Sequence, residues 1–129
     1  MKQGAGTIST ETGLLKDAPY SLAARVENAK GTNPEELVGA ALAGCFSMKF
    51  VGVLTEAGFV TDEVKTTARV TLETQGGLKI TKIELICAAR VQNIDDAKLQ
   101  ELGQRSKETC PVSMLYHGGA EITLQLTRG

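Results

Sequence analysis

Residues 34–58 read PEELVGAALAGCFSMKFVGVLTEAG, and this stretch decides the fold. It begins with a proline and two glutamates, which suit the first turn of a helix, and Thr32 or Asn33 can cap that turn. From residue 37 to residue 54 the chain is apolar except at Gly39, Gly44, Ser47, Lys49 and Gly52. Apolar side chains therefore lie nearly all round the helix, which predicts a buried central helix that ends near Gly58.

A membrane-spanning helix is the alternative interpretation of the same stretch. Lys49 lies in its middle, three glycines dilute it, and no aromatic belt flanks it. These features favour the core helix of a soluble protein, and no membrane partner is expected.

Composition limits the possible functions of the chain. Its 129 residues and 13.6 kDa fit a single domain over residues 1–129, and 42% of them are apolar, enough for a core. The 14 basic and 15 acidic residues give a net charge of -1, and aromatics are 4% with no Trp. This balance argues against nucleic-acid binding, which needs a basic surface.

The three cysteines are too few for a disulfide scaffold. The first seven residues, MKQGAGT, contain no apolar stretch of the kind found in a secretory signal. We therefore expect a cytoplasmic protein whose cysteines are reduced at rest.

Alternating and helical patterns predict the elements around the central helix. Residues 20–27 alternate as a strand with Arg25 on its polar face, and residues 7–12 are its expected partner. Residues 64–74 form a second strand, followed by a turn at 75–77 and a third strand whose apolar face carries Ile83, Leu85, Cys87, Ala89 and Val91.

The C-terminal part of the chain completes the predicted order β-β-α-β-β-α-β. Residues 95–108 are expected to form a helix capped by Asp95 or Asp96, and Pro111 is expected to begin a short one. Residues 121–127 alternate as a last strand. One small sheet covers only one face of a helix that is apolar all round, so we expect a homodimer.

The cysteines are the candidates for chemistry. Cys45, inside the apolar helix, is either a small buried hydrophobe or a nucleophile. Cys110, before Pro111 at a helix start, is either an incidental cap residue or a thiol that helix N–H groups activate. Cys87 lies on the apolar face of a strand and is expected to be buried and inert.

Other side chains narrow the possible mechanisms. His117 is the single histidine and Cys-x-x-Cys is absent, which argues against a structural zinc site and against a Cys–His dyad. If Cys45 is a nucleophile, a permanently charged arginine is the natural group to stabilise its thiolate, and Arg25 is the candidate. The alternative for Arg25 is a solvated surface residue.

Most of this sequence resembles one protein family. Residues 30–48, KGTNPEELVGAALAGCFSM, closely resemble the signature of the OsmC/Ohr family of thiol peroxidases. The match continues with EAGF at 56–59, ITKIEL at 80–85 and CPVS at 110–113, and GTISTETG at 6–13 resembles the OsmC (osmotically inducible protein C) branch.

The resemblance implies a fold and a set of site residues. The fold class is α/β (α+β), an OsmC-like intertwined homodimer in which antiparallel sheets cover two long central helices. Cys45 falls on the peroxidatic position and Cys110 on the resolving position. Arg25 and Glu35 fall on the activating arginine and its carboxylate partner, although the arginine lies at different places in the two branches of the family.

The resemblance also implies a reaction. An organic hydroperoxide, or less efficiently hydrogen peroxide, oxidises Cys45 to a sulfenic acid, which condenses with Cys110 to a disulfide. A dithiol, of the lipoyl type by family precedent, reduces the disulfide, and no metal, haem or other cofactor is needed. Glu35 and Cys45 are ten residues apart on one helix, about 15 Å along its axis, so Glu35 is expected to serve the partner's site.

Two features depart from the family pattern. Relatives usually carry another short strand, with a Trp and a Gly, before the segment at residues 6–13, so either the sheet lacks this edge strand or the sequence starts inside the pattern. Residues 115–119 also differ from the family.

Two other functions remain open at this stage. One is a non-catalytic dimeric protein that binds an apolar ligand and has redox-inert cysteines. The other is a thiol–disulfide exchange protein, against which the absence of Cys-x-x-Cys weighs.

Overall fold

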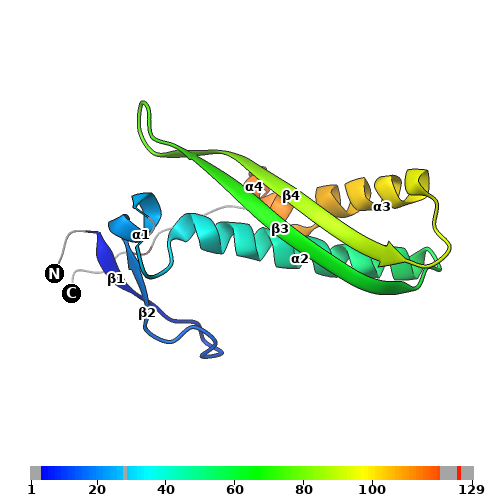
Figure 1. Ribbon diagram of the computed structural model, residues 1–129, viewed down its shortest axis with the longest axis horizontal. Coiled ribbons are helices and arrows are strands. Elements are labelled where there is room, and N and C mark those ends of the chain that lie inside the picture. The colour runs from blue at the N-terminus through cyan, green and yellow to red at the C-terminus, as the bar shows by residue number, and fades with distance from the viewer. Residues whose placement is uncertain (1–3, 28, 120–124, 126–129) are drawn as a thin grey trace. The chain divides into compact units, whose positions relative to one another are not determined.

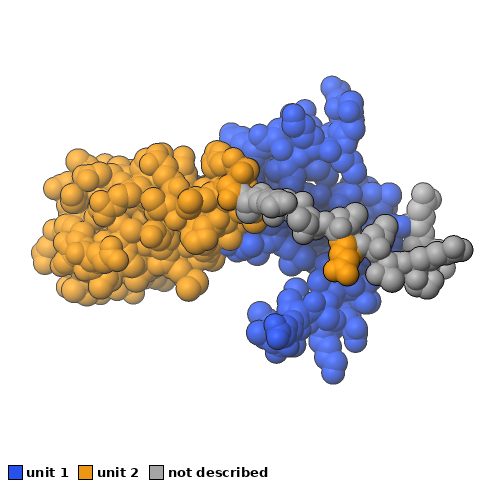
Figure 2. Space-filling view, turned by 180° about the vertical axis from the view of Figure 1, so that it is seen from behind, with its two compact units in different colours: residues 1–41, 67–85 blue, residues 42–66, 86–129 orange. Residues whose placement is uncertain are grey.

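The computed structural model of the protein describes residues 4–27, 29–119 and 125. These residues form two compact units (Figure 2). The first comprises Met1–Ala41 and Thr67–Leu85, and the second comprises Leu42–Thr66 and Ile86–Gly129. The longest elements of the described chain are helix α2 (Pro34–Glu56) and strands β3 (Thr61–Glu73) and β4 (Lys79–Val91) (Figure 1). Each of them contributes residues to both units.

Helix α2 spans Pro34–Glu56 and confirms the predicted central helix. Its first turn is capped by Asn33, whose Oδ1 accepts a hydrogen bond from the backbone N–H of Glu36 at 2.8 Å. One side of the helix is buried at Leu42, Phe46, Phe50, Val53 and Leu54. The rings of Phe46 and Phe50 lie 5.4 Å apart, so this stripe forms the core of the second unit.

The opposite side of α2 is apolar but exposed in the single chain. Met48 is 80% exposed and Val51 is 38% exposed. Gly44 and Gly52 lie on the same side, and a Cβ atom built on either would meet no atom of the described residues within 4 Å. The sequence pattern identified the helix correctly, but one chain covers only part of its apolar surface.

That apolar length also meets a simple membrane criterion. By length and composition alone, α2 could cross a bilayer. The core helix of a soluble protein meets the same criterion.

Strands β3 (Thr61–Glu73) and β4 (Lys79–Val91) form a two-stranded sheet (Figure 1). Gly76 and Gly77 have φ angles of 75° and 114° in the turn between them, a conformation that L side chains rarely adopt. The predicted hairpin is therefore confirmed. In β3 the less exposed side chains include Ala68, Val70 and Leu72, which share one face.

The N-terminal segment differs from its predicted form. Strand β1 (Ala5–Ile8) pairs antiparallel with β2 (Ala18–Ser21), so two paired strands form here but overlap the predicted ranges 7–12 and 20–27 only at residues 7–8 and 20–21. Helix α1 (Leu22–Val26) occupies most of the predicted strand 20–27. Ser21 caps α1 by accepting a hydrogen bond from the N–H of Ala24 at 3.0 Å.

The alternation of residues 20–27 was therefore misleading. Leu22 and Val26 are one helical turn apart and both about half exposed, whereas Ala24 is buried. Arg25 consequently projects from a helix, not from the polar face of a strand.

Helices α3 (Asp96–Thr109) and α4 (Pro111–Tyr116) confirm the predicted C-terminal helices. Asp95 caps α3 by accepting from the N–H of Lys98 at 2.7 Å, and Leu102 is buried. The predicted strand at 121–127 lies outside the described residues except for residue 125.

Candidate active site

Arg25 and Glu35 form an ion pair within the first unit. Helix α1 carries the arginine, and the first turn of α2 carries the glutamate. Arg25 Nε donates to Glu35 Oε2 at 3.1 Å, and the two side chains are 24% and 15% exposed. Partial burial makes this pair stronger than an ion pair in open solvent, and it fixes the orientation of the guanidinium.

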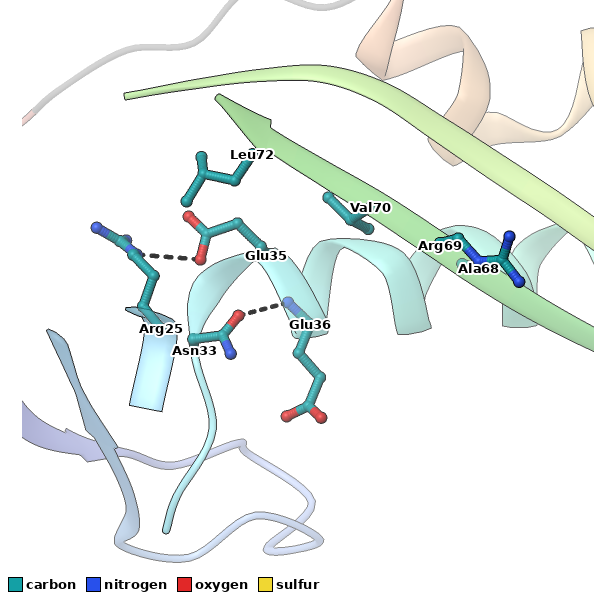
Figure 3. Close-up of a pocket in the computed structure, with 8 residues that line it drawn as sticks. All are labelled: Arg25, Asn33, Glu35, Glu36, Ala68, Arg69, Val70 and Leu72. Carbon is teal, nitrogen blue, oxygen red and sulfur yellow. Dashed lines mark hydrogen bonds and ion pairs between the residues drawn. The ribbon is translucent and has the colours of Figure 1, made fainter. Parts of the chain in front are cut away.

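A cavity of about 400 Å³ lies beside this ion pair (Figure 3). Its lining residues are Arg25, Asn33, Glu35, Glu36, Ala68, Arg69, Val70 and Leu72. Figure 3 shows Leu72 next to the Glu35 carboxylate, whereas the Arg69 guanidinium lies at the far end of the group. The cavity therefore combines an oriented cation with an apolar wall from β3, which suits a small molecule with one polar and one apolar end.

The cavity wall was not predicted from the sequence. The alternation of residues 64–74 placed Ala68, Val70 and Leu72 on one face, but it could not indicate that this face adjoins Arg25. That proximity depends on the non-local packing of β3 against the start of α2. Gly39 permits the packing, because a Cβ there would lie 2.9 Å from Val70 Cγ2.

Cys45 and Cys110 come together within the second unit. Cys45 is partly exposed on α2, whereas Cys110 is fully buried between α3 and α4. Cys45 is near enough to Cys110 to raise the pKa of the Cys110 thiol. Cys45 and Cys110 are separated by 65 positions in the sequence, yet they are neighbours in the fold while both are free thiols.

Burial controls the protonation of Cys110. Removal from solvent raises the pKa of its thiol, and the hydrogen bond to Cys45 and the charge of Cys45 raise it further. The backbone N–H groups of Ser113 and Val112 act in the opposite direction and are outweighed. Cys110 is therefore held as a neutral thiol at pH values where an exposed cysteine begins to ionise.

Tyr116 is a neighbour of Cys110 that sequence reasoning missed. Burial raises the pKa of its phenol, and the charge of Cys110 raises it further. Tyr116 ends α4, six positions after Cys110, and no local pattern in the sequence indicated that the two interact. It lies in residues 115–119, which depart from the family pattern.

The structure thus brings the four candidate residues together as two pairs, one in each unit. The remaining cysteine and the histidine lie elsewhere. Cys87 is exposed on β4, which corrects the expectation of a buried residue. Alternation identifies the face of a strand but does not show whether another element covers that face at each position; Leu85 and Ala89 on the same face are less exposed than Cys87. His117 is exposed at the end of α4.

Across residues 4–27, 29–119 and 125, no group of three or more His, Cys, Asp or Glu side chains is arranged to hold a metal ion. The chemistry that the described residues offer is that of two thiols in contact and of an oriented guanidinium.

Comparison with known proteins identifies the family. The model of the OsmC family, described as OsmC-like protein, matches residues 27–125. The chain belongs to the OsmC family. Peroxiredoxin OsmC of Escherichia coli (strain K12) is 47% identical over 125 residues, which cover 96% of this chain and 86% of the relative.

Relatives in the Ohr branch are more distant. The organic hydroperoxide resistance protein OhrB of Bacillus subtilis (strain 168) is 31% identical over 125 residues, which cover 95% of this chain and 89% of that protein. The crystal structure of OhrB superposes on this OsmC family chain with a TM-score of 0.65 and 28% identity, covering 92% of this chain and 87% of that one. An α+β fold of the OsmC type is therefore confirmed.

Proposed function

We propose that this protein is a thiol peroxidase that reduces organic hydroperoxides, and hydrogen peroxide less efficiently, through Cys45 and Cys110. The observation that carries the proposal is the contact between these two free thiols, one partly exposed and the other buried. Membership of a family that includes Peroxiredoxin OsmC and the organic hydroperoxide resistance proteins supports the same activity. A ligand-binding protein with inert cysteines has no need of this contact.

The first step is the attack of the Cys45 thiolate on the distal oxygen of the hydroperoxide. The S–O bond forms as the O–O bond breaks, and the alcohol leaves after taking up a proton. Arg25 stabilises the negative charge that develops on the peroxide oxygens, and Glu35 keeps the guanidinium oriented through its 3.1 Å contact with Nε. The wall of Ala68, Val70 and Leu72 accepts the alkyl group.

The second step joins the two cysteines. Cys110 attacks the sulfenic sulfur of Cys45, the S–S bond forms, and water leaves. A dithiol, of the lipoyl type or another small dithiol, then reduces the disulfide by thiol–disulfide exchange. The reaction needs no metal, haem or other cofactor, and the reducing conditions that it requires fit a cytoplasmic location.

We further propose that the active site is shared between two chains of an intertwined homodimer, each chain being a single OsmC-like domain over residues 1–129. Glu35 and Cys45 are ten residues apart on α2, about 15 Å along the axis, so the Arg25–Glu35 pair is too far from the Cys45 of its own helix. Two central helices then face each other through the exposed apolar side of α2, with Met48 and Gly44 at the contact.

The glycines on that side support a helix contact. A glycine inside a helix costs about 0.5–1 kcal/mol relative to alanine. No atom of the described residues lies within 4 Å of a Cβ built on Gly44 or Gly52, so none of these residues requires glycine there. Close approach of the backbone of a partner chain accounts for glycine at both positions.

The test of the proposed function is peroxide consumption by the reduced protein with dihydrolipoamide as the electron donor. Wild-type protein is expected to turn over cumene hydroperoxide, and Cys45→Ser is expected to abolish turnover. Cys87→Ser is the matched control, because Cys87 is exposed on β4 and takes no part in the proposed steps. Full turnover by Cys45→Ser would show that the assignment is wrong.

A further inference from the structure

Cys45 and Cys110 differ in how closely a molecule in solution can approach them. Cys110 is 0% exposed, whereas Cys45 is partly exposed on α2. The proposed reaction with peroxide needs an opening only at Cys45, because this is the sulfur that the hydroperoxide must reach. Cys110 reacts only with the sulfenic sulfur of Cys45, so its enclosure does not hinder the oxidative steps.

The position of Cys110 is fixed by the backbone on both sides of it. Its N–H donates to the carbonyl of Ser106 at 3.0 Å at the end of α3, and its carbonyl accepts from the N–H of Met114 at 3.0 Å at the start of α4. Ser106 and Ser113, four positions before Cys110 and three after it, are also buried. Exposure of the Cys110 sulfur to a second reactant therefore requires the two helices to separate at this junction.

A disulfide between these cysteines offers its reductant two sulfurs, and two effects compete in the choice. A thiol with a higher pKa is the poorer leaving group, and burial raises the pKa of the Cys110 thiol. This effect favours attack on Cys110 with Cys45 leaving, whereas access favours attack on Cys45. Leaving-group ability changes the rate of exchange gradually, but a sulfur that the reductant cannot approach is not attacked, so access decides.

We infer that the reducing dithiol attacks the Cys45 sulfur of the Cys45–Cys110 disulfide and that Cys110 is the leaving thiol. This inference rests on the proposed peroxidase function and deepens it. It assigns the two cysteines different roles in the reductive half of the cycle, in which Cys45 alone bonds to the reductant.

The electrons and protons of the two exchange steps balance. A thiolate of the reductant forms an S–S bond with Cys45 as the Cys45–Cys110 bond breaks, and Cys110 takes up a proton. The second thiolate of the dithiol then attacks the reductant sulfur of this mixed disulfide and releases Cys45 as a thiolate. The dithiol ends as a disulfide, oxidised by two electrons, and both cysteines end reduced.

The experiment locates the mixed disulfide that a monothiol forms with the oxidised wild-type protein. A monothiol has no second sulfur to complete the reaction, so the first adduct can be trapped. Protein carrying the Cys45–Cys110 disulfide receives 2-mercaptoethanol or glutathione, is quenched in acid at early times, and has its free thiols blocked with N-ethylmaleimide.

Tryptic digestion then separates the two candidate sulfurs. Cys45 is released in peptide 31–49 and Cys110 in peptide 108–128, so mass spectrometry assigns the adduct to one of them. We expect at least about tenfold more adduct on Cys45 than on Cys110 with both monothiols, and N-ethylmaleimide on Cys110.

The matched control is the same oxidised protein unfolded in guanidinium chloride. Unfolding exposes both sulfurs equally, so we expect adducts on the two peptides within about threefold of each other. Cys87, in peptide 83–90, is a free thiol and is expected to carry only N-ethylmaleimide in every sample, which excludes stray oxidation.

Two results would overturn the inference: adduct mainly on Cys110 in the folded protein, or the same distribution of adduct in the folded and unfolded protein. Failure of the proposed function appears one step earlier and is distinct. In that case one equivalent of cumene hydroperoxide forms no Cys45–Cys110 disulfide in the wild-type protein, and the inference is overturned together with the function.

Discussion

Glu35 and Glu36 are neighbours in the first turn of α2 and differ in what they contact. Glu35 Oε2 lies 3.1 Å from Arg25 Nε, whereas Glu36 Oε2 accepts from the Thr32 hydroxyl at 2.6 Å. We predict that Glu35→Gln lowers kcat/KM for cumene hydroperoxide by about ten- to a hundredfold, because the guanidinium loses its orientation. Steady-state kinetics with dihydrolipoamide measures this.

Glu36→Gln is the control for that substitution, since it changes the same charge one position away. We expect its kcat/KM to remain within about twofold of wild type. Equal losses in the two variants would contradict a specific role for the ion pair and would indicate a general effect of charge at the start of α2.

The raised pKa of Cys110 makes the free energy of unfolding depend on pH, and it determines the direction of that dependence. Burial, the first cause, raises the pKa of its thiol above the ordinary value of 9.0, so the folded state binds more protons than the unfolded state at alkaline pH. The free energy of unfolding is therefore unaffected below pH 8 and falls as the pH rises from about 9 through the raised pKa.

Urea unfolding of the reduced protein at pH 7.5 and pH 10 measures this effect. We expect Cys110→Ala to lose less stability between these pH values than wild type does. Tyr116, whose pKa is also raised, contributes in the same direction at the upper end, so Tyr116→Phe is measured in parallel. An identical pH dependence in wild type and Cys110→Ala would contradict the burial of the neutral thiol.

At the scale of residues, the sequence indicated which residues are candidates for chemistry better than it indicated what surrounds them in the fold. Cys45, Cys110, Arg25 and Glu35 were identified as candidates, and the structure brings them together as two contacting pairs. Arg25 was placed on the wrong kind of element, and the cavity wall and Tyr116 were missed. Each of these depends on which elements pack together, and local patterns of polarity carry no such information.

At the scale of elements, length and capping decided what could be predicted. Helix α2 has a proline start, an Asn33 cap and 23 residues, so many local signals agree. Helix α1 has five residues, and over so few positions a period of 2 and a period of 3.6 cannot be distinguished. Its cap, Ser21, was the one local signal in its favour.

Gly39 gives a prediction at the same scale. A Cβ at Gly39 would lie 2.9 Å from Val70 Cγ2 and 3.4 Å from the Ala68 Cβ, so alanine there separates α2 from the cavity wall. We predict that Gly39→Ala destabilises the protein by about 1–3 kcal/mol, as overpacking does, and lowers activity.

Gly103→Ala in α3 is the matched substitution for Gly39→Ala. A Cβ at Gly103 would make ordinary contacts of 3.8 Å with the Phe50 ring, so the helix gains alanine without a clash. We expect stabilisation by about 0.5–1 kcal/mol, measured by urea unfolding. A stable, fully active Gly39→Ala would contradict the close packing of α2 on β3.

At the scale of the whole molecule, the exposed apolar side of α2 predicts a dimer of twice the 13.6 kDa chain mass. Met48 is 80% exposed in the single chain, which a monomer does not favour in the middle of an apolar helix. We predict that Gly44→Ala weakens the dimer by about tenfold, measured by analytical ultracentrifugation, because a Cβ enters the helix contact. A monomeric wild type, or an unchanged Gly44→Ala dimer, would contradict this contact.

Mixed dimers test whether the site is shared. Chains carrying Cys45→Ser are mixed with chains carrying Glu35→Gln after mild unfolding and refolding. A shared site leaves one intact site in each mixed dimer, so activity is expected to return, up to about half of wild type per mixed dimer. No recovery would place the Arg25–Glu35 pair and the cysteines of one chain in the same site.

The dimer remains a prediction, and the sequence supports only its general form. An apolar helix and a small sheet imply missing cover, and a second subunit is the simplest source of it. Which residues of one chain meet which residues of the other depends on the docking of two surfaces, and no local pattern encodes that.

The central claim is that peroxide joins Cys45 to Cys110, and mass spectrometry tests it most directly. Reduced protein receives one equivalent of cumene hydroperoxide, is blocked with iodoacetamide and is digested with trypsin. We predict a disulfide between peptide 31–49 and peptide 108–128, with Cys87 in peptide 83–90 alkylated. Recovery of Cys45 and Cys110 as alkylated thiols, with the hydroperoxide unconsumed, would contradict the claim.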